Sequence, residues 1–285
     1  DTFNTAVGAD AGLSVTTGVR NTILGGRAGD ALTDADYNVA IGTDALTADT
    51  LGSKSVAIGV DALGNQNFTT ATDSLNTAVG YAAGLRVTTG IRNTLVGSLA
   101  GDAITDADNN VAVGTNALGT NQLGSANIAI GRLALGTMNP ATAANTYNTA
   151  VGADAGASVT TGTQNTLIGG QAGDALTTGA QNVAIGREAL KTQDGAANNV
   201  AVGRTAGAAV TTGDRNTLIG GLAGDALTTG SKNVIAGYDT DVDSSGRFGA
   251  VALGSELSTH AANNSFRVKG DGGVYNTGNT SAWNT

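Results

Sequence analysis

The chain has 285 residues, of which 44 are glycine, one is proline and none is cysteine, and its formal net charge is −9 at pH 7. Aromatic residues, at 4%, are too few for an ordinary globular core, whereas a hydrophobic content of 40% excludes a disordered chain. The acidic balance argues against a nucleic-acid partner, no apolar run is long enough to cross a membrane, and the lack of cysteine excludes disulfides and thiolate metal sites. We therefore expect a thin core of Ala, Val, Ile and Leu that recurs along the chain.

The chain repeats one pattern at a regular interval, with asparagine at position 1 of the unit and glycine at position 5. The units begin at residues 4, 21, 38, 55, 76, 93, 110, 127, 148, 165, 182, 199, 216, 233 and 250. The step between starts is 17 except at two places, where it is 21, and a longer period of 72 indicates duplication at two levels. Structural repeat residues of this pattern include Asn4, Gly8, Asn21, Gly25, Asn38, Gly42, Asn76, Gly80, Asn148 and Gly152. Such a fixed period is typical of a solenoid.

Each unit opens with a short apolar run that ends at glycine, such as Val39, Ala40 and Ile41 before Gly42. This composition predicts a strand of four or five residues followed by a turn. In a strand, positions 2 and 4 share one face and position 3 lies on the other. Because both faces are apolar, we expect burial on both sides, with the small residues of position 3 close to an axis shared by several chains.

A second large side chain occupies one of two places in each unit. Some units carry Gly at position 9 and Val, Leu or Ile at position 12, as in Gly12 with Val15, whereas others carry Leu at position 9, as in Leu46. This exchange holds the core volume and predicts a second strand at positions 8 to 13, facing the first. The asparagines either stack from coil to coil as a ladder or serve as turn residues with positive φ, and both interpretations stay open.

These elements predict an all-β fold, a homotrimeric parallel β-roll or β-solenoid of about fifteen 17-residue coils. The repetitive shaft covers residues 1–258, and a non-repetitive segment covers 259–285. Within that segment the alternation of Ser265 to Lys269 predicts a strand, and Gly270 to Gly273 a turn. The opening at Asp1 suggests a processed or trimmed piece of something longer.

Two units are longer than the others, because they carry long turns at 64–75 and 136–147. A loop that interrupts a uniform rod is a candidate receptor contact, and neutral drift in an exposed turn is the alternative. The side chains that single out these turns are Phe68, Met138, Pro140 and Tyr147.

The sequence predicts no catalytic residue, no cofactor and no metal site. The single histidine, His260, has no partners for a catalytic triad or a metal cluster, and we expect it at the surface. The segment from Asp239 to Asp243 is similar to a calcium loop but has Ser244 where glycine is required, so calcium binding there stays open.

Other polar residues recur too often for a catalytic site, which is needed only once. Position 10 carries an aspartate in four units, and we expect a structural role for these residues, which are Asp30, Asp102, Asp174 and Asp225. Repeated Thr-Thr-Gly runs raise the idea of an ice-binding solenoid, but adjacent threonines of a strand point to opposite sides, so a turn role is favoured. Arginines at position 17 are expected to be solubilising rim charges: Arg20, Arg92 and Arg215.

Repeats of the form N-[TV]-A-[VI]-G over residues 4–258 resemble the head of trimeric autotransporter adhesins, although the unit here is longer. That resemblance implies a left-handed parallel β-roll trimer. The C-terminal segment resembles the stretch that precedes the self-cleaving intramolecular chaperone of phage tail fibres and tailspikes. The residues that carry this resemblance are Gly272, Gly273, Val274, Tyr275, Asn276, Thr277, Gly278 and Trp283.

Together the two resemblances imply the shaft of a homotrimeric phage tail fibre or virion appendage that mediates attachment to a bacterial surface. The implied partners are two further copies, other tail or fibre proteins, and a host surface glycan or protein, and the implied location is the virion. Alternatives are the head of a bacterial trimeric adhesin on the cell surface, a glycan-degrading tailspike and an ice-binding solenoid. The end at Thr285 fits either a cleavage point or an arbitrary end.

Overall fold

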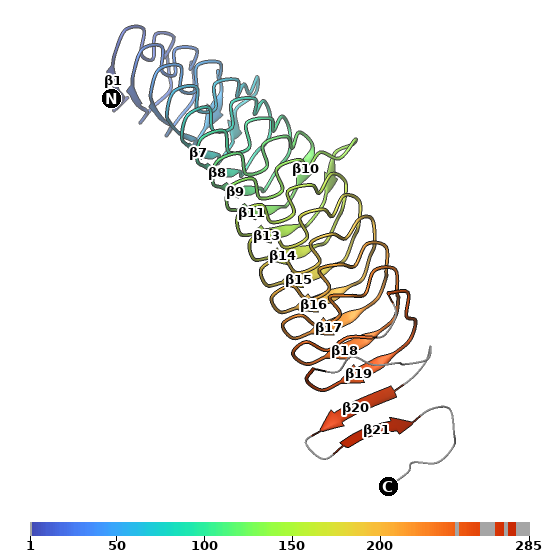
Figure 1. Cartoon of the computed structure of the whole chain (residues 1–285). Helices are drawn as coiled ribbons and strands as arrows, with labels where there is room; N and C mark the ends of the chain where they lie inside the picture. Colours follow the sequence, from blue (N-terminus) through green and yellow to red (C-terminus); the bar gives the residue numbers. More distant parts are fainter. Residues whose placement is uncertain (1, 243–244, 257–265, 271–272, 278–285) are drawn as a thin grey trace. The chain divides into compact units, whose positions relative to one another are not determined.

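The computed structural model describes residues 2–242, 245–256, 266–270 and 273–277, and it contains strands and turns but no helix within these ranges. Successive 17-residue units form successive coils of a parallel β-solenoid of about fifteen turns, as Figure 1 shows. The predicted all-β parallel β-solenoid is thereby confirmed. The chain divides into two compact units, Asp1–Tyr147 and Asn148–Thr285.

The first unit contains eight coils whose strands pair in parallel with the next strand one coil away. Each strand has three residues, fewer than expected, because the glycine of position 5 ends it. Paired residues are 17 apart, as in Thr22 and Val39, or 21 apart across a long turn, as in Val56 and Thr77. These strands are β1 (Thr5–Val7), β2 (Thr22–Leu24), β3 (Val39–Ile41), β5 (Val56–Ile58), β7 (Thr77–Val79), β8 (Thr94–Val96), β9 (Val111–Val113) and β11 (Ile128–Ile130).

The second unit repeats this ladder and ends in a hairpin. Its solenoid strands are β13 (Thr149–Val151), β14 (Thr166–Ile168), β15 (Val183–Ile185), β16 (Val200–Val202), β17 (Thr217–Ile219), β18 (Val234–Ala236) and β19 (Val251–Leu253). Strand β20 (Phe266–Gly270) continues the parallel ladder beside β19 and pairs antiparallel with β21 (Gly273–Thr277). The strand expected near residues 265–269 is therefore present.

The second strand predicted at positions 8 to 13 is wrong. These positions form turns, because positions 7 and 9 take positive φ, as in Asp10 at 57° and Gly12 at 61°. A residue in that conformation cannot continue an extended strand. Backbone hydrogen bonds still run between coils there, as from the Gly12 N–H to the Ala28 oxygen at 2.9 Å. The only other strand pairs of the described solenoid lie at the long turns: β4 (Gly52–Ser53) with β6 (Thr72–Asp73), and β10 (Gly124–Ser125) with β12 (Ala144–Asn145).

The two faces of the strand are used differently from the prediction. Position 3 points into the chain's own core, where Ala40, Ala57 and Leu95 are completely buried. Positions 2 and 4 point outward, and Val7 is 57% exposed. The expectation that position 3 lines an axis between chains is therefore wrong. The side chain of position 3 fills the interior of its own coil, which the short strand leaves few other residues to fill. The face that remains for a partner is that of positions 2 and 4.

The predicted exchange of core volume is confirmed. In the coil that begins at Asn21, Ile23 and Leu32 are both buried, and a Cβ added to Gly29 at position 9 would lie 2.8 Å from Leu32 Cδ1. In the next coil Ala40 replaces the large residue of position 3, and Leu46 at position 9 fills the space. Glycine and leucine thus alternate at one backbone position because the same small core is filled from different points.

The asparagines of position 1 form a buried ladder along each unit. In the second unit Asn165 Oδ1 accepts the backbone N–H of Asn182 at 3.0 Å, and Asn165 Nδ2 donates to the Gly179 oxygen at 2.8 Å. The ladder interpretation is confirmed, although the main bonds run to the backbone rather than between amides. Positive φ belongs instead to the preceding residue, position 17, as in Gln164 at 59°.

Candidate functional site

The outward positions 2 and 4 of the strands form one uncharged surface in each unit, which we call the outer strand face. It consists of Thr, Val, Ile, Leu and one Ala, and its residues are half-buried by their neighbours or exposed. Leu24 in the first unit and Ile219 in the second are 47% and 46% exposed. At about 4.8 Å per coil, eight coils extend this face over roughly 35 Å. Contiguous apolar surface of such length is typical of an interaction site.

Each strand lies between two residues of positive φ, and the three parts together are called a row. The first residue of a row is the last residue of the preceding unit, which is position 17 or, in the two long units, position 21. The last residue of a row is position 7. In one row these are Lys54 and Asp61, whose N–H groups donate to Asp36 and Thr43 oxygens of the preceding row at 2.9 and 3.0 Å. The first residues are exposed, apart from a half-buried alanine and glycine, whereas most of the last ones are half-buried. Both ends border the outer strand face.

The charges of the two row ends differ. The first residues within the first unit include Arg20, Lys54 and Arg92 and no acid. The last residues include three acids, Asp10, Asp44 and Asp61, and one cation, Arg27, and the others are uncharged. Arg27 is bonded within its own chain to Asp44 Oδ2 at 2.6 Å. Arg20 lies over the ring of Tyr37, with its guanidinium carbon 5.2 Å from the ring centre. In the first unit the charged residues of one border of the outer strand face are thus all cations, and those of the other border are carboxylates apart from Arg27.

A buried polar network anchors the first long turn. Asp49 is completely buried, and its Oδ1 accepts the N–H groups of Gly52 at 3.0 Å and Phe68 at 3.1 Å, while its Oδ2 accepts Gln66 Nε2 at 2.6 Å. Burial raises the pKa of this carboxyl, against the opposing hydrogen bonds from Gln66, Phe68 and Gly52. Sequence reasoning missed this network, although polar residues at position 12 of the leucine-type units were a signal for it.

Gln66 also supplies an amide where the asparagine ladder lacks one. Position 1 of its unit is Ser55 instead of asparagine, and Gln66 Nε2 donates to Ser55 Oγ at 2.9 Å. Gln66 Oε1 accepts Asn76 Nδ2 at 2.9 Å, so the amide that Ser55 lacks is supplied from the other side of the coil. The Ser55 hydroxyl also bonds to Ser74. The long turn is therefore fixed to the coil by polar bonds at its base.

The four side chains singled out in the long turns have different positions. Phe68, Met138 and Pro140 are buried, and Met138 occupies the place in its long unit that Gln66 holds in the other. Their side chains pack the bases of the turns. Tyr147 is 55% exposed. The exposed residues of these turns include the runs 69–71 and 141–145 as well as Leu75 and Tyr147, so the surface open to a receptor differs from three of the four side chains singled out.

The aspartates of position 10 are half-buried, as a structural role requires. Asp30 Oδ1 accepts the Thr47 hydroxyl at 2.6 Å. Burial raises the pKa of Asp102, Asp174 and Asp225. The threonines of position 13 use their hydroxyls within the chain, as Thr160 does in donating to the Thr177 oxygen at 3.2 Å.

One carboxyl group of the second unit stands out. Asp241 Oδ2 accepts the Ala226 N–H at 2.9 Å, its Oδ1 accepts the Val242 N–H at 2.8 Å, and Asp225 lies beside it. Burial, with a smaller contribution from the neighbouring Asp225, raises the pKa of Asp241 to about 6 against the opposing backbone hydrogen bonds from Val242 and Ala226. Among the described residues no group of three or more His, Cys, Asp or Glu is placed to hold a metal. Asp243 of the suggested calcium loop lies outside the described residues, as do His260, Gly272, Gly278 and Trp283.

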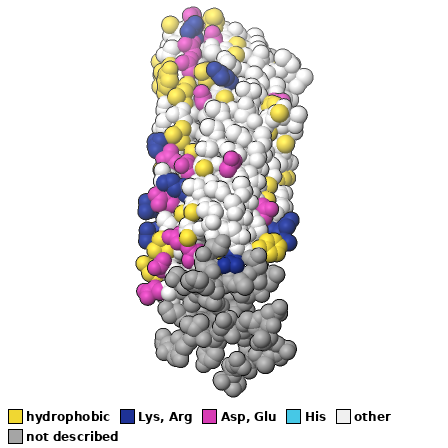
Figure 2. All heavy atoms as spheres, turned by 45° about the vertical axis from the view of Figure 1, so that its right-hand side comes forward, with side chains coloured by type: hydrophobic (Ala, Val, Ile, Leu, Met, Phe, Trp, Pro, Cys, Tyr) yellow, Lys and Arg dark blue, Asp and Glu magenta, His cyan; other side chains and the backbone are white. Residues whose placement is uncertain are grey.

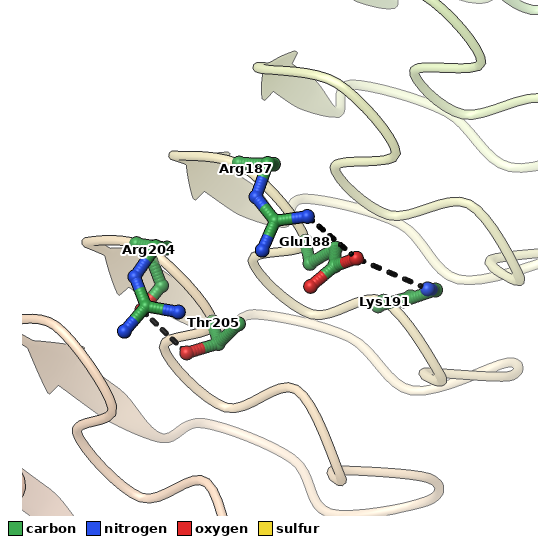
Figure 3. Close-up of polar contacts among 5 residues, drawn as sticks. All are labelled: Arg187, Glu188, Lys191, Arg204 and Thr205. Atoms are coloured by element: carbon green, nitrogen blue, oxygen red, sulfur yellow. Dashed lines mark hydrogen bonds and ion pairs between the residues drawn. The ribbon is translucent and has the colours of Figure 1, made fainter.

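An ion-pair cluster follows strand β15 (Figure 3). Glu188 Oε1 accepts from Arg187 at 3.0 Å and from Lys191 at 3.3 Å, and Arg204 occupies the place of Arg187 in the next coil. The arginine side chain of this pair is 59% exposed, so the pair is well screened by water. In the view of Figure 2 basic side chains likewise lie close to acidic ones, and uncharged polar side chains and backbone cover much of the rest.

The described part of the chain has no helix long and apolar enough to cross a membrane. Comparison with known protein families gives no match, and no curated protein matches the chain significantly.

Proposed function

We propose that the chain is the shaft of a homotrimeric phage tail fibre or virion appendage that attaches the particle to a bacterial surface, and that it has no catalytic role. The observation that carries this proposal is the outer strand face, an apolar surface on every coil that a single chain leaves facing water. Three copies that direct these faces toward a common axis would remove them from water. Backbone ladders along the coils would then supply rigidity, and three equivalent ends would supply avidity.

The head of a bacterial trimeric adhesin is the second candidate, and the N-[TV]-A-[VI]-G repeat favours it. The two candidates share the trimer and differ in what the whole gene encodes. An outer-membrane anchor with a coiled-coil stalk selects the adhesin. A chaperone module after the hairpin selects the phage fibre.

Attachment is tested by incubating the labelled, assembled chain with a panel of whole bacteria and with their purified surface polysaccharides. Saturable binding to cells, without release of reducing sugar ends, is the expected result. Release of reducing ends would identify a glycan-degrading tailspike instead. An assembled chain that binds neither cells nor polysaccharide would contradict an attachment role for this part of the fibre.

A further inference from the structure

The rows of the solenoid carry a pattern that has no use within one chain. The first and last residues of a row are separated by an extended strand and its glycine, about 20 Å of chain, so they do not meet within the same coil. Nevertheless the chemistry of the two ends is matched in several rows. Lys54 shares a row with Asp61, and Lys232 shares a row with Asp239.

The match extends to uncharged rows. Asn109 shares a row with Asn116, and Gln164 shares a row with Gln171. Leu75, which is 47% exposed, shares its row with Ala82. In these rows an amide corresponds to an amide, and an apolar residue to an apolar residue. Three rows with an arginine at the first end are not matched: Arg20 shares a row with Arg27, Arg92 with Leu99, and Arg215 with Leu222. In the first of these rows Asp44 already neutralises Arg27 within the chain.

We infer that the row ends are the contacts that set the direction and register of self-association: the first residue of each row meets the last residue of the same row in a parallel neighbouring copy. This inference rests on the self-association proposed above and assigns residues to it. Copies arranged around a closed rotation axis have no axial offset, so corresponding rows lie at one height. The first end of one copy then faces the last end of the next.

Charge complementarity selects this arrangement over the antiparallel one. If two outer strand faces met in antiparallel orientation, first ends would face first ends, and the cations Arg20, Lys54 and Arg92 would lie on a common border. Like charges on both sides of an interface disfavour that pairing. In the parallel arrangement Lys54 faces Asp61, whose carboxylate has no side-chain hydrogen bond or ion pair of its own among the described contacts.

A charge exchange tests the inference. The full chain is prepared as Lys54→Glu, Asp61→Lys and the double variant, and its molar mass is measured over a dilution series. Each single variant places like charges at every equivalent contact, so we expect the dissociation midpoint to rise about tenfold or more. The double variant restores opposite charges and is expected to return within about threefold of the original chain.

Two controls separate this effect from others. Arg86→Glu makes the same charge change at position 11, away from both row ends, and is expected to leave the midpoint unchanged. Lys54 also forms an ion pair with Asp73 in its own chain, and both Lys54→Glu variants lose it, so recovery in the double variant cannot come from that pair. A double variant as weak as the singles, or singles equal to Arg86→Glu, would overturn the inference while leaving the assembly itself intact. An original chain that stays single at all concentrations would instead remove the proposed shaft.

Discussion

At the scale of single residues, the repeat is fixed by two requirements that operate between coils. The glycine of position 5 lies directly against the glycine of the next coil, and the asparagine of position 1 bonds to the backbone of the next coil. Both are local consequences of stacking backbones at a strand's spacing. They explain why position 5 is glycine in every unit and why position 1 is asparagine in all units except those that begin at Ser55 and Ala250.

Gly80→Ala is predicted to be strongly destabilising. Gly80 has φ of +139°, and an added Cβ would lie 2.5 Å from the Gly97 oxygen, so both backbone strain and a clash with backbone result. We expect a loss of about 3 kcal/mol in the free energy of unfolding, measured by chemical denaturation. The matched control is Gly26→Ala at position 6, where an added Cβ has no atom within 4 Å and no positive φ is required. A control as damaging as Gly80→Ala would contradict this account.

Asn165→Ala is predicted to cost about 1 to 3 kcal/mol, because it leaves the Asn182 N–H and the Gly179 oxygen without their partner in a buried place. Thermal unfolding measures the stability of this variant against that of Thr178→Ala, which changes an exposed residue of the same coil. Equal stability of the two variants would show that the ladder contributes nothing.

Asp241 gives the second unit a specific pH dependence. Its pKa is raised from 3.8 to about 6, so the folded chain binds the proton more tightly than the unfolded chain does. Its contribution to stability is therefore most favourable below about pH 4 and is lost as the pH rises through about 6. We expect Asp241→Asn to flatten this part of the profile of unfolding free energy between about pH 4 and 7. Asp106→Asn, at an exposed carboxyl of the first unit, should leave the profile unchanged, and identical profiles for all three proteins would refute the assignment.

At the scale of elements, buried polar side chains at the base of the first long turn fix that turn to the coil. Asp49, in the unit before the first long turn, accepts three hydrogen bonds at the base of that turn. The corresponding residue in the unit before the second long turn is Asn121, which bonds both backbone groups of Gly124. The two copies therefore differ in their polar bonds: Asp49 bonds to the inserted turn, whereas Asn121 bonds to its own unit. The exposed tips of the two turns can vary without disturbing the coil.

Asp49→Ala is expected to destabilise the first long turn more than the remaining coils. Three buried donors lose their acceptor, and we expect a loss of about 3 kcal/mol in stability. Hydrogen exchange should accelerate at the Phe68 and Gly52 amides and stay slow in β8. Asp49→Asn, which introduces the residue of the other copy, should have a smaller effect. Uniform acceleration across all coils would show that the network is not local.

Much of this element pattern could be predicted from the sequence, and the misses have physical reasons. The period, the strand at positions 2 to 4 and the exchange of Gly29 with Leu46 follow from apolar patterning and volume. The turns at positions 8 to 13 could not be predicted, because non-glycine residues such as Asp10 and Leu46 adopt positive φ there. The inward direction of position 3 was ambiguous because both faces of the strand are apolar. The buried position of Phe68 and Met138 depends on polar partners that only the folded turn brings together.

At the scale of the whole molecule, the account depends on the outer strand face being covered by other copies. Ile58→Asp would place a charge on that face, where a single chain leaves the residue half-buried and an assembly would bury it fully. We expect the folded coil to persist while the assembly is lost, because an unpaired charge cannot be accommodated in an apolar interface. Circular dichroism monitors the fold. Thr69→Asp, on the exposed tip of the long turn, is the control and should leave the assembly unchanged.

The molar mass of the undenatured chain, measured by light scattering, tests the central claim most directly. The account predicts a mass three times the 27.7 kDa of a single chain. A mass of 27.7 kDa that does not change with concentration would contradict it, because the outer strand face would then remain open to water in a stable single chain.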